Sequence, residues 1–331
     1  MRGMNRRRAL LALTALGSCV VLPWARAQAP ATLPKVALFT FGSRYNARSR
    51  TEAFFKAMRE LGYEEGKNIH YESRFANGQP DLLRELAQEV AREHVDVVVS
   101  ASTLTTEALL QATSSVPIVM AAIEDPVISG FVKSLARPET NVTGLTANAV
   151  DQVPKHMELL LKAVPGIGKA AALMNPTNAV YAAYRSRLEW VAKSSRVRLA
   201  VTDAITYRDI ERAFKRFGEA PVGGLIVMSD STFYTERNTI TELAARLRIP
   251  AVYPQRAYAE AGGLISYGQN YEFNYARAAT YVDRILKGEK PGEMPIEEPT
   301  NHELVVNRNA ARSLGLALPA ELLKHADKVI G

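Results

Sequence analysis

The sequence predicts an α/β protein of two similar lobes, each an open parallel sheet with helices on both faces. From Lys35 onward, short apolar runs of strand length alternate with amphipathic stretches of helix length, the pattern of βαβ units. The alternation occurs twice, with a break near residues 141–144. The chain has 331 residues, 47% hydrophobic and 8% aromatic, which allows two lobes and excludes collagen-like, disordered and multi-span membrane classes.

The first series of elements precedes the break. Apolar residues at helical spacing and short apolar runs separate helices from strands, Pro80-Asp81 begins one helix, and Gly62 ends another. The predicted strands are 36–41, 69–75, 95–99 and 118–122, and the predicted helices are 50–61, one from about 80, and 103–112, with an amphipathic turn at 131–135. The segment Asn141-Val142-Thr143-Gly144 is then predicted to cross to the second lobe.

The second series has the same pattern, and right-handed crossovers make each half a doubly wound sheet. Its predicted helices are 155–163, 181–194, 209–217 and 236–247, and its predicted strands are 170–174, 198–202, 225–228 and 251–253. The tail adds a strand at 264–267, a helix at 271–286, a Pro/Gly-rich stretch to 299 and a strand at 304–307.

Residues 1–27 form a predicted signal peptide. A basic stretch ending at Arg8 precedes an apolar run at 9–22 and the small-x-small sequence Ala25-Arg26-Ala27. The run is shorter than the roughly 20 residues of a spanning helix, so we expect export to the periplasm rather than a permanent anchor. Arg7-Arg8 also resembles a twin-arginine signal, and the choice between the two export routes stays open.

The only cysteine, Cys19, lies in this segment. Leu16-Gly17-Ser18-Cys19 resembles a lipoprotein processing box, but the apolar run continues through Leu22, so cleavage after Ala27 is favoured over lipid attachment at Cys19. The mature chain would then contain no cysteine. That prediction excludes thiol catalysis, disulfides and cysteine metal sites.

Charge and motifs argue against a nucleic-acid partner and against an enzyme. The net charge is +7, but five arginines and no acidic residue lie in residues 1–27, which leaves 36 basic against 34 acidic residues, or +2. The sequence has no phosphate loop, nucleophile elbow or dinucleotide fingerprint, and none of its five histidines are three or four residues apart. We expect no cofactor and no metal.

Candidate binding residues follow the predicted strands, where ligands bind in open α/β sheets. Phe41 and Ser43 follow the first strand, and Ser102 and Thr103 open a helix whose first amides suit a carboxylate. Simple helix capping by Ser102 or Thr103 explains the same pattern equally well. After the strand ending near Ala122, Glu124 and Asp125 offer a carboxylate to a ligand ammonium group, with Asp125 preferred, although a turn before proline is an equal alternative.

Further candidates follow strands of the second series at equivalent places. They are Asn175, Ser229, Asp230, Tyr253 and Tyr267. Asn-Pro and Ser-Asp are also common turn formers, and a single tyrosine more often packs in a core, so their recurrence at the same end of successive strands is the stronger argument.

Several segments resemble the ABC-transporter substrate-binding proteins related to tryptophan-binding lipoproteins. The most specific are Arg59-Glu60-Leu61-Gly62-Tyr63-Glu64-Glu65-Gly66-Lys67-Asn68-Ile69, Gln111-Ala112-Thr113, Val116-Pro117-Ile118-Val119-Met120, Asp125-Pro126-Val127, residues 130–138 and Asn141-Val142-Thr143-Gly144. Two departures lie near the crossing region, Pro138-Glu139-Thr140-Asn141 in place of Pro-Gly-Gly-Asn, and Pro154 in place of glycine.

The resemblance implies the type I periplasmic-binding-protein fold, with lobes at 34–143 plus 269–298 and at 144–268 plus 299–331 joined by three crossings. It also implies a monomer that binds an amino acid or related metabolite in the cleft between the lobes and delivers it to an ABC permease. A periplasmic sensor that contacts a membrane receptor is the alternative. An exported hydrolase with an unrecognised serine or carboxylate site is a third hypothesis.

Overall fold

The computed structural model of the protein describes residues 33–331, so the predicted signal peptide and Cys19 lie outside the described residues. Two sheets organise the described chain. In this part of the chain, no helix is long and apolar enough to cross a membrane.

The first sheet has five strands in the order β2-β1-β3-β4-β5, and every pair is parallel. Its strands are β1 (Lys35–Thr40), β2 (His70–Phe75), β3 (Val97–Ser100), β4 (Ile118–Ile123) and β5 (Val142–Thr146). The helices between them are α1 (Arg44–Glu60), α2 (Pro80–Arg92) and α3 (Thr103–Ala112). Because Gly144 pairs with Met120 inside this sheet, the chain leaves it after Thr146 rather than at 141–144.

The second sheet has seven strands in the order β12-β11-β10-β9-β8-β6-β7. Its strands are β6 (Lys169–Met174), β7 (Arg198–Asp203), β8 (Gly224–Val227), β9 (Ala251–Tyr253), β10 (Ile265–Gln269), β11 (His302–Asn307) and β12 (Lys328–Ile330). The accompanying helices are η1 (Ala149–Gln152), α4 (Val153–Ala163), α5 (Tyr181–Ser194), α6 (Tyr207–Glu219), α7 (Ser231–Thr235), α8 (Arg237–Arg246), α9 (Arg256–Glu260), α11 (Arg308–Leu314) and α12 (Ala320–Lys324).

One strand pair of the second sheet, β10 and β11, is antiparallel, with Gln269 opposite His302. Between these strands the chain visits the first sheet through α10 (Tyr271–Leu286) and η2 (Pro291–Glu293). The chain therefore re-enters the second sheet at the same edge of the sheet from which β10 left it. Strand β11 consequently runs antiparallel to β10.

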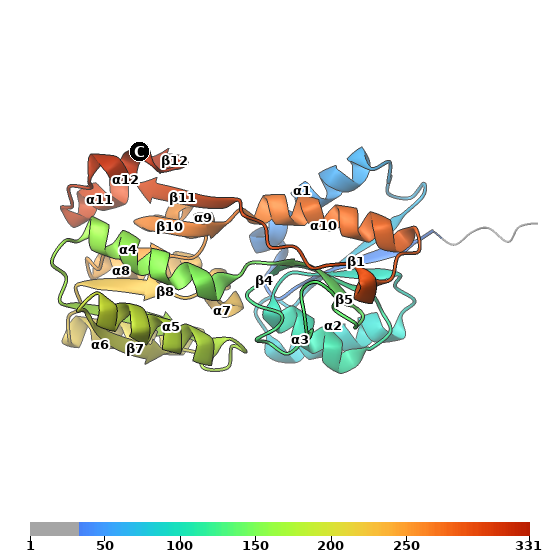
Figure 1. Ribbon diagram of the computed structural model, residues 1–331, viewed down its shortest axis with the longest axis horizontal. Coiled ribbons are helices and arrows are strands. Elements are labelled where there is room, and N and C mark those ends of the chain that lie inside the picture. The colour runs from blue at the N-terminus through green and yellow to red at the C-terminus, as the bar shows by residue number, and fades with distance from the viewer. Residues whose placement is uncertain (1–32) are drawn as a thin grey trace, which may run out of the picture. The chain divides into compact units, whose positions relative to one another are not determined.

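Helix α10 packs on the first sheet beside α1 (Figure 1). Its residues Tyr275, Ala278 and Val282 share a buried cluster with Val36 and Val99 of the first sheet. We use first lobe for the five-stranded sheet with α1 to α3 and α10, and second lobe for the seven-stranded sheet with its helices.

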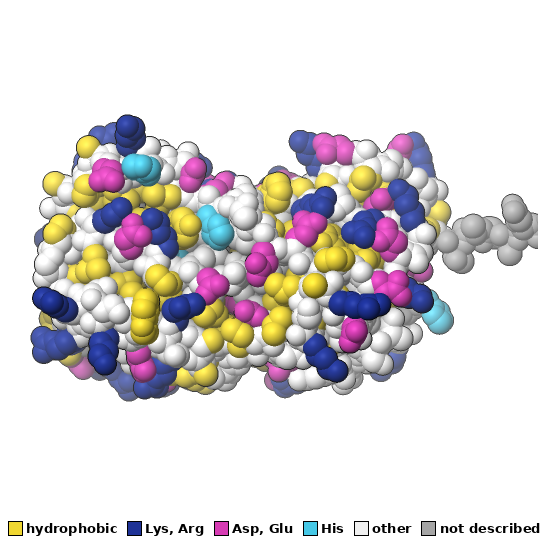
Figure 2. Space-filling model, in the orientation of Figure 1, with side chains coloured by type: hydrophobic (Ala, Val, Ile, Leu, Met, Phe, Trp, Pro, Cys, Tyr) yellow, Lys and Arg dark blue, Asp and Glu magenta, His cyan; other side chains and the backbone are white. Residues whose placement is uncertain are grey.

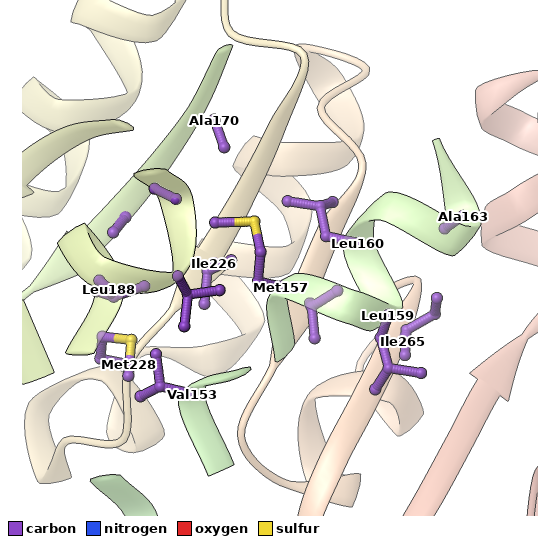
Figure 3. Packing of buried hydrophobic residues seen from close by; sticks show 14 of the residues in the cluster. Val153, Met157, Leu159, Leu160, Ala163, Ala170, Leu188, Ile226, Met228 and Ile265 are labelled. Atoms are coloured by element: carbon purple, nitrogen blue, oxygen red, sulfur yellow. The ribbon is translucent and has the colours of Figure 1, made fainter. Parts of the chain in front are cut away.

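Each lobe has its own apolar clusters. In the second lobe, Met157 and Leu160 of α4 pack with Ile226 of β8 and Ile265 of β10 (Figure 3). Full burial of each such side chain contributes about 1.5–3 kcal/mol, so these clusters fix the helices against the strands whose ends carry the site.

A single carboxamide lies where the chain passes between the lobes. Gln269 Nε2 donates to the carbonyl oxygens of Thr146 at 3.2 Å and of Pro299 at 2.9 Å, and Gln269 Oε1 accepts from Asn274 Nδ2 at 2.7 Å. Thr146 and Pro299 belong to the first and third passages, and Gln269 itself to the second. This one side chain connects all three.

Two predicted elements differ from those observed. Helix α1 begins at Arg44, six residues before the predicted start, because Ser43 caps it. The predicted helix 236–247 is preceded by a separate short helix, α7, which Asp230 caps. The segment 131–135, predicted as an amphipathic turn, runs in bends without helix or strand.

Candidate functional site

A cavity lies where strands of both sheets end, and we name it the central cavity. The first lobe contributes Arg50, Ser102 and Glu124, and the second lobe contributes Asp230 and Gln255. The remaining lining residues are Thr40, Phe41, Gly42, Ala101, Ala122, Ser229, Ser231, Tyr234, Thr235 and Tyr271.

Glu124 follows β4 directly and is buried in the central cavity. Its carboxylate accepts a hydrogen bond from Thr103 Oγ1 and one from Ser229 Oγ at 3.3 Å, so it is bonded to both lobes. Burial raises the pKa of Glu124 to about 7, the negative charge of Asp230 adds to the increase, and the hydroxyl groups oppose it. Glu124 therefore exchanges a proton near neutral pH.

Asp230 is the second buried carboxylate of the cavity. It accepts hydrogen bonds from Asn175 Nδ2 at 3.1 Å and Asn178 Nδ2 at 3.2 Å. It also caps α7, accepting from the backbone N–H groups of Thr232 at 2.8 Å and Phe233 at 3.3 Å. Burial raises its pKa, against the effect of these donors.

Arg50 places a positive charge in the same cavity. It lies on the buried face of α1 and is 6% exposed. Its guanidinium covers the ring of Tyr234 at 4.5 Å and that of Tyr275 at 5.6 Å, and donates to the carbonyl oxygen of Asn46 at 3.2 Å. No carboxylate of residues 33–331 pairs with it within 4.0 Å. The guanidinium is thus available to an anionic group.

Three polar side chains form one wall of the central cavity. Gln255 Nε2 donates to Ser229 Oγ at 3.1 Å and to the hydroxyl of Tyr271 at 3.0 Å. Ser229 in turn donates to Glu124. The hydrogen-bonded chain from Tyr271 to Glu124 fixes the positions of these groups at the cavity.

A wider groove adjoins the central cavity and is also lined by both lobes. The two share Phe41, Glu124 and Asp230, and the groove adds the apolar side chains of Leu104 and Ile205. Ile205 and Tyr207, at its outer part, are among the exposed large side chains of the described chain. The groove therefore reaches the surface of the protein.

Six of the ten candidate residues line the central cavity or the groove. They are Phe41, Ser102, Thr103, Asn175, Ser229 and Asp230. Ser102 lines the central cavity and also caps α3, accepting from the Thr105 N–H at 3.4 Å. A position at the cavity and helix capping, which the sequence left as alternatives, are therefore compatible for this residue.

The other four candidates lie outside these cavities. Asp125 Oδ1 accepts from the backbone N–H groups of Val127 and Ile128, both at 2.9 Å, so it stabilises the turn, and its neighbour Glu124 lines the central cavity instead. Ser43 caps α1, accepting from the Asn46 N–H at 3.3 Å.

Tyr253 and Tyr267 pack against other rings. Tyr253 is buried and stacks on Tyr258 with ring centroids 5.1 Å apart. Tyr267 stacks on His302 at 5.4 Å. The glycine after it, Gly268, is required by packing, because a Cβ there would overlap the carbonyl oxygen of Pro254.

The sequence analysis missed Arg50, Gln255 and Tyr271. Arg50 shares the buried face of α1 with Phe54 and Met58. A charged residue on an otherwise apolar helical face is unusual, and this pattern could have identified Arg50 as a candidate. Tyr271 was missed because β10 continues to Gln269, two residues past the predicted strand end. Gln255 was missed because Tyr253, the last residue of β9 and two residues before Gln255, was chosen as the candidate there.

A two-lobed α/β fold with a polar cavity at the strand ends defines the class of solute-binding proteins with the type I periplasmic-binding-protein fold. Within that class, the chain belongs to the ABC transporter substrate binding protein family, which matches residues 35–330. The family, the tyrosine-binding relative and the L-Trp-bound relative described below are solute-binding proteins rather than enzymes.

Three relatives illustrate the similarity. A tyrosine-binding protein of Clostridioides difficile (strain R20291) is 26% identical over 278 residues, 83% of this chain and 79% of that protein. A conserved domain protein of Vibrio cholerae has a TM-score of 0.84 and 28% identity, covering 89% of this chain and 99% of its own. An ABC domain of Streptococcus pneumoniae in complex with L-Trp has a TM-score of 0.83 and 22% identity, covering 90% and 100%.

Proposed function

We propose that this chain is the exported binding component of an ABC importer and captures a free L-amino acid with an aromatic side chain in the central cavity. The observation that carries the proposal is the placement of Arg50 against Glu124 and Asp230 in one buried cavity. Opposite charges within a single small site match the two charged groups of a zwitterion.

The roles of the charged residues follow from their surroundings. Arg50 has no carboxylate partner among residues 33–331, so a ligand carboxylate supplies one, in the bidentate geometry that a guanidinium favours. Glu124 and Asp230 approach from opposite lobes and together receive the ammonium group. Ser102, Thr103, Asn175 and Ser229 hold these groups or border the ligand, and Phe41 borders it with an apolar ring.

Aromatic residues of the site and the named relatives support the choice of ligand. Phe41, Tyr234 and Tyr271 line the central cavity and offer ring faces to an aromatic side chain. One relative is named a tyrosine-binding protein and another was solved with L-Trp.

The cellular setting is part of the proposal. The signal peptide at 1–27 supports export to the periplasm, where the protein acts as a monomer and delivers the ligand to an ABC permease in the inner membrane. Acidic and basic side chains lie intermixed on the viewed face, which fits a small-molecule ligand better than a nucleic acid (Figure 2). We place the lobes at 34–146 plus 269–298 and at 147–268 plus 299–331, which moves the first passage of the predicted division to follow Thr146.

Isothermal titration calorimetry of the purified mature protein with the twenty L-amino acids tests the proposal. An aromatic amino acid should bind, and Arg50→Met should weaken its binding at least a hundredfold. Arg48→Met is the matched control, because Arg48 lies on the same helix and pairs with Glu52 at the surface. Equal affinity in both variants, with unchanged thermal midpoints without ligand, would remove the zwitterion assignment.

A further inference from the structure

One short segment of the second lobe lies against the first lobe beside the central cavity. It runs from Ser231 to Arg237, covers α7 and the start of α8, and is named here the α7 segment. A Cβ added to Gly42 would lie 3.4 Å from Thr235 Oγ1, and one added to Gly78 would lie 3.6 Å from Thr235 Cγ2. The α7 segment therefore contacts the loops that follow β1 and β2 of the first lobe.

The ring of Tyr234, in this segment, is shared by guanidinium groups from both lobes. Arg50 of the first lobe lies 4.5 Å from the ring centroid, and Arg237 of the second lobe lies 4.9 Å from it. Each contact is a cation–π interaction, which is stronger where water is excluded. Because Arg50 is 6% exposed, the ring holds its guanidinium without neutralising the charge.

Asn46 of α1 connects the same two arginines by hydrogen bonds. Its Oδ1 accepts from Arg237 Nη1 at 3.0 Å, and its backbone carbonyl oxygen accepts from Arg50 Nη2 at 3.2 Å. Arg237 Nη1 also donates to the carbonyl oxygen of Tyr234 at 2.9 Å. These four residues thus form one cluster that spans the two lobes.

Few other contacts fix the guanidinium of Arg50. Within residues 33–331, its only hydrogen bond goes to Asn46, and its buried Nε has no partner. The second ring near it, that of Tyr275, is farther away, at 5.6 Å. The position of this charge at the central cavity therefore depends on Tyr234, a residue of the other lobe.

We propose that Tyr234 and Arg237 are positioning residues for Arg50, so that the second lobe directs the cation of the first lobe toward the anionic group of a ligand. The proposal rests on the proposed function, in which Arg50 binds a carboxylate. It adds that this charge is correctly placed only while the α7 segment lies on the first lobe. A ligand that lacks an anionic group gains nothing from the placement.

Calorimetry with L-tryptophan and L-tryptophanamide on the mature protein tests this role, because the amide keeps the ring and the ammonium group but lacks the carboxylate. Tyr234→Leu removes the ring under Arg50 and should weaken binding of the acid by about tenfold, while binding of the amide changes less than about twofold. Tyr234→Phe keeps the ring and should retain the native affinity for both ligands.

Two arginine variants complete the comparison. Arg237→Met should act in the same direction as Tyr234→Leu, and it carries the test if Tyr234→Leu does not fold. Arg246→Met is its matched control, because Arg246 is exposed at the other end of α8. In Arg50→Met, which should bring the acid to the affinity of the amide, adding Tyr234→Leu should cause no further loss, since a positioning residue acts only through its target.

The remaining outcomes overturn the proposal in distinguishable ways. An equal loss for acid and amide in Tyr234→Leu means that the ring borders the ligand or holds the lobes together without positioning Arg50. If Arg50→Met weakens binding of the acid while Tyr234→Leu and Arg237→Met do not, the positioning role is wrong and the proposed function stands. If Arg50→Met has no effect, or no amino acid binds, the proposed function fails as well. If another amino acid binds in place of L-tryptophan, that amino acid and its amide form the test pair.

Discussion

Glu124 and Asp230 are both buried carboxylates at strand ends, one from each lobe, yet their surroundings differ. Asp230 accepts from two side-chain amides and two backbone N–H groups, while Glu124 accepts from two hydroxyl groups. The groups that donate to Asp230 all belong to its own lobe, the second. Glu124 of the first lobe, in contrast, accepts one of its hydrogen bonds from Ser229 of the second lobe.

The difference gives Asp230 a structural role in addition to its proposed contact with the ammonium group, and it leaves Glu124 as the carboxylate whose charge can respond to the ligand. Asp230 is needed by the second lobe whether or not ligand is present, because it caps α7 and pairs Asn175 and Asn178. Glu124 has a pKa of about 7 and can be neutral or charged at little cost near that pH. An ammonium group next to Glu124 would favour its charged form.

The largest expected effect concerns stability. Asp230→Ala removes the cap of α7 and leaves two buried amide groups unpaired, so we expect the free energy of unfolding to fall by about 3 kcal/mol. Urea denaturation of the ligand-free protein measures it. A loss below about 1 kcal/mol would show that Asp230 is no more structural than Glu124.

Ligand-free stability should also depend on pH through Glu124. Its pKa is about 7 in the folded protein against 4.5 as an ordinary group, so the folded state binds more protons between these values. Stability should therefore fall as pH rises from 4.5 to 7, by up to about 3 kcal/mol. Thermal midpoints of the native protein across this range should fall relative to those of Glu124→Gln, which lacks the titrating group; parallel curves would contradict the shift.

Affinity should follow the opposite trend with pH. Because the charged form of Glu124 binds the ammonium group, affinity for the amino acid should rise about tenfold from about pH 6 to about pH 8. Calorimetry in two buffers of different ionisation enthalpy should detect a proton released on binding near pH 6. Glu124→Gln should bind more weakly with a flat pH profile, and a flat profile in the native protein would exclude this role.

A smaller effect distinguishes Glu124 from its neighbour. Asp125→Ala removes the acceptor for the N–H groups of Val127 and Ile128, so we expect a loss of about 1 kcal/mol in the free energy of unfolding. Affinity should change less than about twofold because Asp125 lies outside the central cavity. A tenfold loss of affinity would restore Asp125 to the site.

The smallest effect is expected at Ser43. Ser43→Ala removes the cap of α1, a bond of 3.3 Å, and should cost about 0.5 kcal/mol in unfolding free energy. Ligand affinity, measured by calorimetry, should be unchanged. A larger loss of affinity than of stability would mean that Ser43 contacts the ligand.

Much of the fold could be predicted because its signals are local. Apolar runs such as Ile118–Ile123 become buried strands, and the predicted helix 271–286 has the bounds of α10. The antiparallel direction of β11 could not be predicted, because it follows from the chain visiting the other lobe between β10 and β11.

The site was predicted less completely because strand ends and side-chain directions decide it. Ser229 and Asp230 could be chosen as candidates because they come two and three residues after the end of β8, where they line the central cavity. Choosing between Glu124 and Asp125 requires knowing which side chain faces the cavity and which faces the turn, and adjacent residues give no signal for that. Arg50 comes from the middle of a helix, where a search confined to strand ends does not look.

The carboxamide of Gln269 has a mechanical consequence. Since it touches the first and third passages and lies on the second, a rotation of the lobes that separated any two passages would break one of its hydrogen bonds. Rotations whose axis passes near Gln269 leave these distances almost constant. The three passages should therefore act as one pivot near Gln269, which opposes sliding of one lobe past the other.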